Sequence, residues 1–202
     1  MRRALRLLAV TMIAAGGLLL ADGIATLAWR EPVTSVYAGV QQDKLDARLR
    51  VVERASARDV ARAARVARRR ADSGEPIGRL RVPAVGLRAV VVEGTAPAAL
   101  RRAPGRYTDS AMPGARGTVA IAGHRTTYGA HFRRLGELRR GDRIELAMPY
   151  GRFVYRVERT RVLPPTATWV TRRVSYDRLV LTACHPLWSA AERIVVFARA
   201  VA

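Results

Sequence analysis

Short apolar runs separated by turn residues make up this chain from Ile77 onward. Most are rich in Val, Ile and Leu and end at Gly, Pro or Asp, which is typical of short β-strands and excludes a mainly helical fold. So many short strands with little helix predict an all-β barrel or sandwich. The expected strands cover residues 77–82, 87–92, 117–123, 143–148, 153–163, 178–184 and 193–200, with short helices at 98–102 and 131–138.

The N-terminal residues have a different composition from this region. Three arginines precede an apolar run from Leu7 to Trp29. As a helix this run would span about 34 Å, enough for the roughly 30 Å core of a bilayer. We expect residues 1–30 to be a cytoplasmic tail and single-pass signal anchor, because basic residues before the run favour a cytoplasmic N-terminus and an extracellular remainder. A cleaved signal peptide is the alternative, although the run is longer than an ordinary signal core.

A stretch without Gly or Pro follows, from Val40 to Ala71, and its pattern is typical of a helix. Its apolar positions recur at spacings of three and four, but several are Ser or Ala, and arginines cover the other faces. We therefore expect residues 31–75 to form a solvated basic helical stalk and linker, and residues 76–202 to form the folded domain. A helix lying on the membrane surface is the alternative, but the stripe lacks Trp, Phe and repeated Leu.

The net charge is +20, and nearly all the basic residues are arginine. Such a balance favours attraction to an anionic surface, either lipid head groups or acidic wall polymers. We expect no nucleic acid partner, because the chain shows no nucleic-acid-binding motif and few aromatic residues among the basic ones. A non-enzymatic module that binds wall polymer is an alternative function, but it leaves the lone Cys184 unexplained.

Cys184 is the only cysteine and ends an expected strand. A free cysteine is often just a small buried hydrophobic residue, but an unpaired thiol in an exported protein also indicates reactivity. Two further residues favour a site, since His124 and Arg193 also stand at the ends of expected strands. A thiolate nucleophile needs a positive environment and a general acid/base, and a guanidinium can stabilise an oxyanion. The order His, Cys, Arg fits papain-like enzymes poorly, because those run Cys before His.

At these residues the chain resembles a bacterial sortase, and it is most similar to the class E sortases of actinobacteria. The resemblance covers about residues 76–202. It rests on GTVAIAGHRTTYG at 117–129, LTACHP at 181–186 and AERIVV at 191–196, together with PIGRLRVP at 76–83 and LRRGD at 138–142.

The resemblance implies an all-β, eight-stranded sortase barrel with short helices. It implies a cysteine transpeptidase that cleaves a C-terminal LPxTG- or LAxTG-like sorting signal between Thr and Gly through a thioester, and transfers the surface protein to an amine of a peptidoglycan precursor. By position, Cys184 is the nucleophile, His124 the general acid/base and Arg193 the cation that binds the oxyanion or substrate. The expected substrate contacts are Tyr128, Thr182 and Ala183.

One departure from the family pattern lies beside the nucleophile. Sortases commonly carry Thr directly before the cysteine, where this chain has Ala183 after Thr182. Arg125 is an alternative cation to Arg193. His185 adjoins Cys184, but neighbours on a strand point to opposite faces, which argues against a direct role. With no acidic cluster for calcium, we expect no metal, and we expect no cofactor.

Two enzymatic alternatives remain open. One is another cysteine acyl-transfer enzyme of the cell wall, such as an L,D-transpeptidase-like cross-linker, but its Ser-His-Gly-Cys signature is absent. The other is a pilin-polymerising sortase, but no Asp-Pro-aromatic lid motif precedes the expected barrel. The sequence therefore favours anchoring of single surface proteins.

Overall fold

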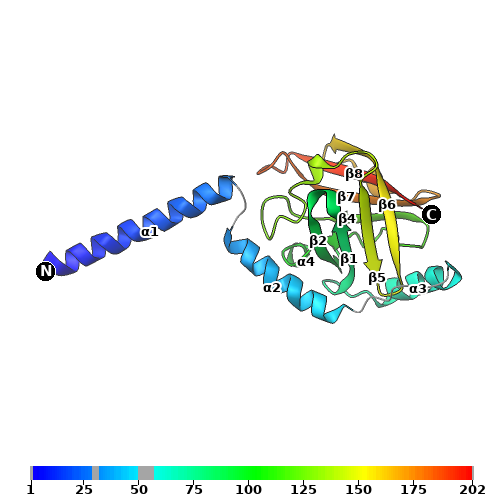
Figure 1. Cartoon of the computed structure of the whole chain (residues 1–202), viewed down its shortest axis with the longest axis horizontal. Coiled ribbons are helices and arrows are strands. Elements are labelled where there is room, and N and C mark those ends of the chain that lie inside the picture. Colours follow the sequence, from blue (N-terminus) through cyan, green and yellow to red (C-terminus); the bar gives the residue numbers. More distant parts are fainter. Residues whose placement is uncertain (1, 29–31, 50–56, 202) are drawn as a thin grey trace.

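The fold is a closed β-barrel with helices at its N-terminal side (Figure 1). The structure is a computed structural model that describes residues 2–28, 32–49 and 57–201. Within these residues the strand order around the barrel is β1-β2-β3-β4-β7-β8-β6-β5. The strands are β1 (Pro76–Val82), β2 (Leu87–Glu93), β3 (Gly105–Arg106), β4 (Gly117–Ala122), β5 (Arg143–Met148), β6 (Gly151–Leu163), β7 (Asp177–His185) and β8 (Glu192–Ala200).

The barrel is mixed, because β2 pairs with β3 and β4 pairs with β7 in parallel, whereas the other pairs are antiparallel. All seven strands expected from the sequence are present, and the barrel expectation is confirmed. The short strand β3 was not predicted, because a Pro-Gly pair reads as a turn. The connecting helical segments are α4 (Pro97–Leu100), η1 (Pro83–Val85), η2 (Leu135–Glu137) and η3 (Thr168–Thr171).

The helix expected over 131–138 is wrong in extent. Only the single 3₁₀ turn η2 forms there. Ala130, just before the segment, has a left-handed backbone with φ of 45°, and Gly136 lies inside it. Both features oppose a continuous α-helix, since the left-handed region is costly for alanine and glycine lowers helix propensity.

Strand β7 is buried on both faces over most of its length. Leu179, Leu181 and Ala183 point into the main core of the barrel. Val180 lies on the other face, in a second cluster that includes Phe197 of β8. Because side chains alternate along a strand, burial of both faces gives a nearly continuous apolar run rather than an alternating one.

A buried ion pair holds the two-residue strand β3 in place. Arg106 is 1% exposed and Glu93 of β2 is 4% exposed. The Arg106 guanidinium donates to both carboxylate oxygens of Glu93, with Nε to Oε2 at 2.9 Å. It also donates to the carbonyl oxygens of Tyr107 and Ser110. These bonds add to the two short backbone ladders that β3 forms with β2 and β4.

Glu93→Leu is expected to lower the free energy of unfolding by about 3–5 kcal/mol, because removing one partner of a buried pair leaves an uncompensated charge. The matched control is Glu158→Leu, which breaks the partly exposed pair with Arg199 and is expected to cost about 1 kcal/mol or less. Urea unfolding followed by circular dichroism measures both values. Equal losses in the two variants would show that the Arg106 pair does not hold the barrel.

Three helices precede the barrel: α1 (Arg2–Ala28), α2 (Pro32–Arg48) and α3 (Ala57–Arg70). In Figure 1, α1 extends away from the barrel. In the described part of the chain, no helix combines the length and apolar character needed to cross a membrane. The expected transmembrane anchor over residues 1–30 is therefore not confirmed.

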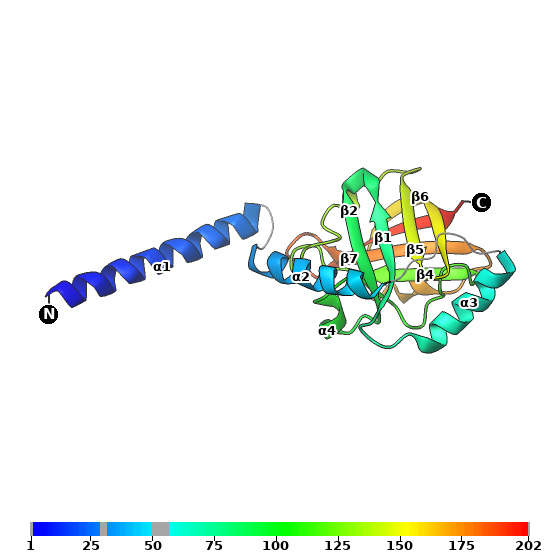
Figure 2. The ribbon, with the colours of Figure 1, turned by 60° about the horizontal axis from the view of Figure 1, so that its bottom comes forward.

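Helices α2 and α3 lie against the barrel (Figure 2). Leu45 of α2 is fully buried and packs with Val90 and Val92 of β2. Ala64 of α3 is also fully buried and joins the main core. The expectation of a solvated stalk is wrong at these faces. Small residues such as Ala64 give little hydrophobic signal in the sequence, but they allow a helix to approach the barrel closely enough to exclude water.

Candidate functional site

Three neighbouring strands bring His124, Cys184 and Arg193 to one edge of the barrel. Strand β4 runs parallel to β7, so the two strands end at the same edge, and Ala122 pairs with Thr182. The Gly123 amide donates to the Thr182 carbonyl at 3.1 Å, and His124 follows directly. Strand β8 is antiparallel to β7 and begins at this edge, where Arg193 pairs with Cys184.

The register places the thiol and the guanidinium on the same face. Directly paired residues of an antiparallel ladder project their side chains to one side, so Cys184 and Arg193 are neighbours there. Cys184 is half-buried. The Arg193 guanidinium donates to the carbonyl oxygens of Ala190 at 2.9 Å and Glu192 at 2.8 Å. It is thus held at the connection between β7 and β8.

Of the expected substrate contacts, Ala183 points into the barrel and away from the face that carries the thiol. Its side chain is 4% exposed and belongs to the main core. Thr182 shares the face of Cys184 by strand alternation, but it is 5% exposed and its hydroxyl lies 3.2 Å from that of Tyr107. The Thr182 hydroxyl therefore ties β7 to the segment after β3, and Tyr128 is the expected contact that stays half-exposed.

Tyr128 lies beside the imidazole of His124. The two ring centroids are 5.2 Å apart with the planes tilted by 50°. The backbone of Tyr128 is left-handed, with φ of 48°, and its amide donates to the Thr34 hydroxyl of α2 at 2.9 Å. The guanidinium of Arg101 lies over the same tyrosine ring, 6.0 Å from its centroid.

The surroundings favour a neutral imidazole. Burial lowers the pKa of His124 below the usual value for histidine, and the positive charge of Arg101 lowers the pKa further. Both causes disfavour the imidazolium form. A neutral ring can accept the proton of the Cys184 thiol, which is the first step in activating a cysteine.

Arg101→Gln is expected to raise the pKa of His124, because it removes a like charge that disfavours protonation. A base with a higher pKa stays protonated to a higher pH, so the acidic limb of the activity profile should move upward. The shift should shrink in high salt, since exposed charges are screened. An NMR titration of the His124 ring measures the change, with Arg102→Gln as control. An unchanged or lowered pKa would contradict the assigned cause.

Arg125 is buried at the end of β7 and contacts the backbone of the nucleophile. It is 8% exposed and donates to the Cys184 carbonyl at 3.2 Å and to the Arg133 carbonyl at 3.3 Å. Its guanidinium is also 3.0 Å from Nδ1 of His185. Burial lowers the pKa of Arg125, the nearby Arg133 lowers it further, and the charge of Cys184 acts in the opposite direction. Arg125 therefore fixes the backbone at the end of β7, a contact across 59 residues that no local pattern indicates.

The described part of the chain contains no group of three His, Cys, Asp or Glu side chains that could hold a metal ion. The chemistry available at this edge is that of a thiol, an imidazole and a guanidinium. Together these groups can supply a nucleophile, a proton carrier and a fixed positive charge.

The comparisons with known proteins agree with this arrangement. Residues 80–201 match the sortase domain family. Sortase D of Bacillus subtilis strain 168 is 32% identical over 134 residues, which is 64% of this chain and 66% of that relative. The structure of sortase E from Streptomyces avermitilis superposes with a TM-score of 0.59 at 29% identity, covering 65% of this chain and 91% of the other.

A Clostridium perfringens sortase D5 transpeptidase shares the fold, with a TM-score of 0.66 at 21% identity, and covers 83% of this chain and all of that one. The similarities include sortases of both class D and class E. The family model spans more than half of the chain, over the segment that carries the β-barrel and all three residues of the edge. The chain therefore belongs to the sortase family of cysteine transpeptidases.

Proposed function

We propose that this chain is a cysteine transpeptidase that cleaves a C-terminal sorting signal on a surface protein and transfers that protein to an amine of a peptidoglycan precursor at the outer side of the cell envelope. The observation that carries the proposal is the convergence of Cys184, Arg193 and His124 at one barrel edge. Membership of the sortase family supports it.

The first half-reaction needs each of these three groups. His124 accepts the thiol proton, and the Cys184 thiolate attacks the carbonyl carbon of the signal threonine. The guanidinium of Arg193 turns from the carbonyls of Ala190 and Glu192 to the developing oxyanion, where a fixed positive charge is most effective. The threonine–glycine C–N bond then breaks, the leaving amine takes the proton from His124, and the acyl group remains on sulfur as a thioester.

In the second half-reaction the proton passes through His124 in the opposite direction, from an amine to the sulfur. The acceptor amine attacks the thioester carbonyl and gives a proton to His124, and the C–S bond breaks to release the thiolate of Cys184. The sulfur then recovers the proton from the imidazolium. Atoms and charge balance over the cycle, since one amide bond is exchanged for another and no redox partner is needed.

The signal is proposed to be of the LPxTG or LAxTG type. Tyr128 is the proposed contact with it, because its ring lies against His124 and stays half-exposed. Thr182 is proposed to support the binding of the signal indirectly, through the hydrogen bond between its hydroxyl and that of Tyr107. The side chain of Ala183 is not part of this contact, because it belongs to the core.

A peptide library tests the proposal. The full chain is incubated with peptides that vary at the second and third positions of the signal, with and without a primary amine, and products are identified by mass spectrometry. Cleavage between Thr and Gly, and a ligated product when the amine is present, are expected. Failure to cleave any signal peptide, with cleavage of a muropeptide instead, would favour a wall cross-linker.

A further inference from the structure

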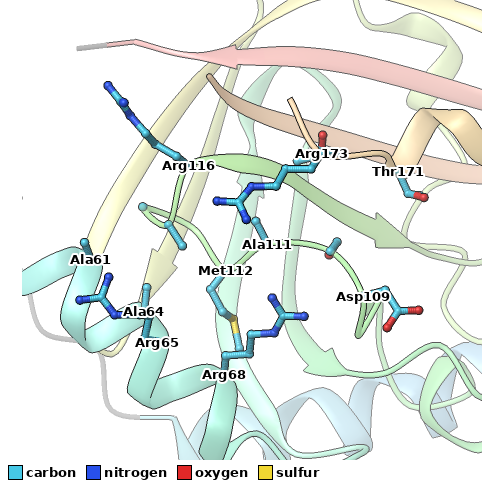
Figure 3. A pocket seen from close by; sticks show the side chains of 14 residues that line it. Ala61, Ala64, Arg65, Arg68, Asp109, Ala111, Met112, Arg116, Thr171 and Arg173 are labelled. Carbon is cyan, nitrogen blue, oxygen red and sulfur yellow. The ribbon is translucent and has the colours of Figure 1, made fainter. Parts of the chain in front are cut away.

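A cavity far from the thiol is unexplained by transpeptidation. It has a volume of about 490 Å³ and lies between helix α3 and the barrel, against the segments 109–118 and 171–173 (Figure 3). This volume is within the range of small-molecule sites. The cavity borders the start of β4, whereas His124 follows the end of that strand. The six residues of β4 separate the two places by about 20 Å.

The hollow is built from small side chains. Ala61 and Ala64 of α3 face Ala111, Gly114 and Ala115 across it. Gly114 has φ of 79°, and a Cβ added there would lie 2.4 Å from a methyl carbon of Val60 and 2.7 Å from the ring of Phe153. Glycine at this position therefore lets α3 dock on the barrel, while the neighbouring alanines leave the space open.

The rim of the cavity is strongly basic. It carries Arg65, Arg68, Arg116 and Arg173 against the single carboxylate of Asp109. None of the four arginines forms a hydrogen bond or ion pair with another residue in the described ranges. In Figure 3 the guanidinium groups of Arg68 and Arg173 extend toward the same space from opposite walls, whereas Arg116 points away.

Gathering like charges is unfavourable unless an anion compensates them, and a guanidinium binds phosphate oxygens through paired hydrogen bonds. Two guanidinium groups that converge from opposite walls suit a ligand with more than one phosphate. The space lies behind a helix, so the flat surface of a bilayer cannot enter it. A small soluble ligand or a segment of a flexible polymer can enter the cavity.

We propose that this cavity is a binding site for a ligand that carries two or more linked phosphate groups, such as a diphosphate or a phosphodiester chain. The site is independent of the transpeptidase centre and does not rest on the proposed function. Arg68 and Arg173 hold the phosphates, and Arg65 adds to the positive potential at the rim.

Calorimetric titration of the full chain with inorganic pyrophosphate tests this site. The double variant Arg68→Gln/Arg173→Gln should weaken binding about tenfold or more. The matched control Arg69→Gln/Arg70→Gln removes the same charge from positions that do not line the cavity, and should change binding less than about twofold, since charges without a direct contact to the ligand are screened by solvent and salt. Peptide cleavage should be unchanged in both variants.

Further arms distinguish the sources of phosphate. A soluble poly(glycerol phosphate) should compete with pyrophosphate, and orthophosphate should bind more weakly than either. Equal losses in the two double variants would overturn the proposal in favour of diffuse charge attraction. Binding to anionic lipid vesicles with none to pyrophosphate or the soluble polymer would also overturn it.

Discussion

Cys184→Ala is expected to abolish cleavage of a sorting-signal peptide, with a loss of about 10⁴-fold or more in kcat/KM. The reason is that the sulfur carries the acyl group, and no other described side chain at this edge is a thiol. The substitution removes one half-buried atom, so the barrel should stay folded. Peptide turnover is measured by chromatography, with circular dichroism as the check on folding.

A swap variant makes the same test sharper. Ala183→Cys/Cys184→Ala keeps one thiol in the chain but moves it to the face of β7 that packs into the core. We expect no recovery of activity, because nucleophile position depends on the strand face and not on the presence of a thiol. Turnover within tenfold of the unmodified chain, in either variant, would contradict the assignment.

His124→Ala is expected to lower kcat by about 10²–10⁴-fold, the usual contribution of a general acid/base. The imidazole both takes the thiol proton and returns it to the leaving amine, so loss of the ring affects both bond-breaking steps. The pH dependence of thiol alkylation should also change, since the group that accepts the proton of Cys184 is gone.

Tyr128→Phe is the matched control for His124→Ala. It keeps the ring that lies 5.2 Å from the imidazole and removes only a hydroxyl. We expect a change in KM rather than a loss of kcat. A His124→Ala enzyme that keeps near-normal kcat, or a Tyr128→Phe enzyme that loses as much as His124→Ala, would remove His124 from its proposed role.

The sequence predicted the strands well because their runs were short, apolar and punctuated by turns. It also placed three chemically related residues at strand ends. Their meeting depends on the barrel order, in which β4 and β8 flank β7. Such an order comes from pairing between distant segments and leaves no local pattern, so the resemblance to sortases supplied it.

Other features gave misleading or weak signals. Arg106 follows a Pro-Gly pair and reads as part of an exposed turn, yet it is 1% exposed. Ala64 reads as a neutral helix position, yet it is buried against the barrel. The orientation of Ala183 was predictable, since the alternation that turns His185 away from the thiol turns Ala183 away as well.

Arg125 is the clearest case of a side chain whose contacts the neighbouring sequence does not predict. Its place after His124 suggested a second cation for the substrate, whereas its guanidinium contacts the Cys184 carbonyl and the ring of His185. A long flexible side chain can reach several partners, and the choice among them depends on tertiary packing.

The thioester is the most direct test of the account. The full chain is mixed briefly with an excess of signal peptide, quenched in acid and measured by intact mass spectrometry, followed by peptide mapping. We predict an added mass equal to the peptide up to its threonine, located on Cys184 and discharged by a primary amine. Efficient cleavage with no such adduct, or an adduct on another residue, would contradict it.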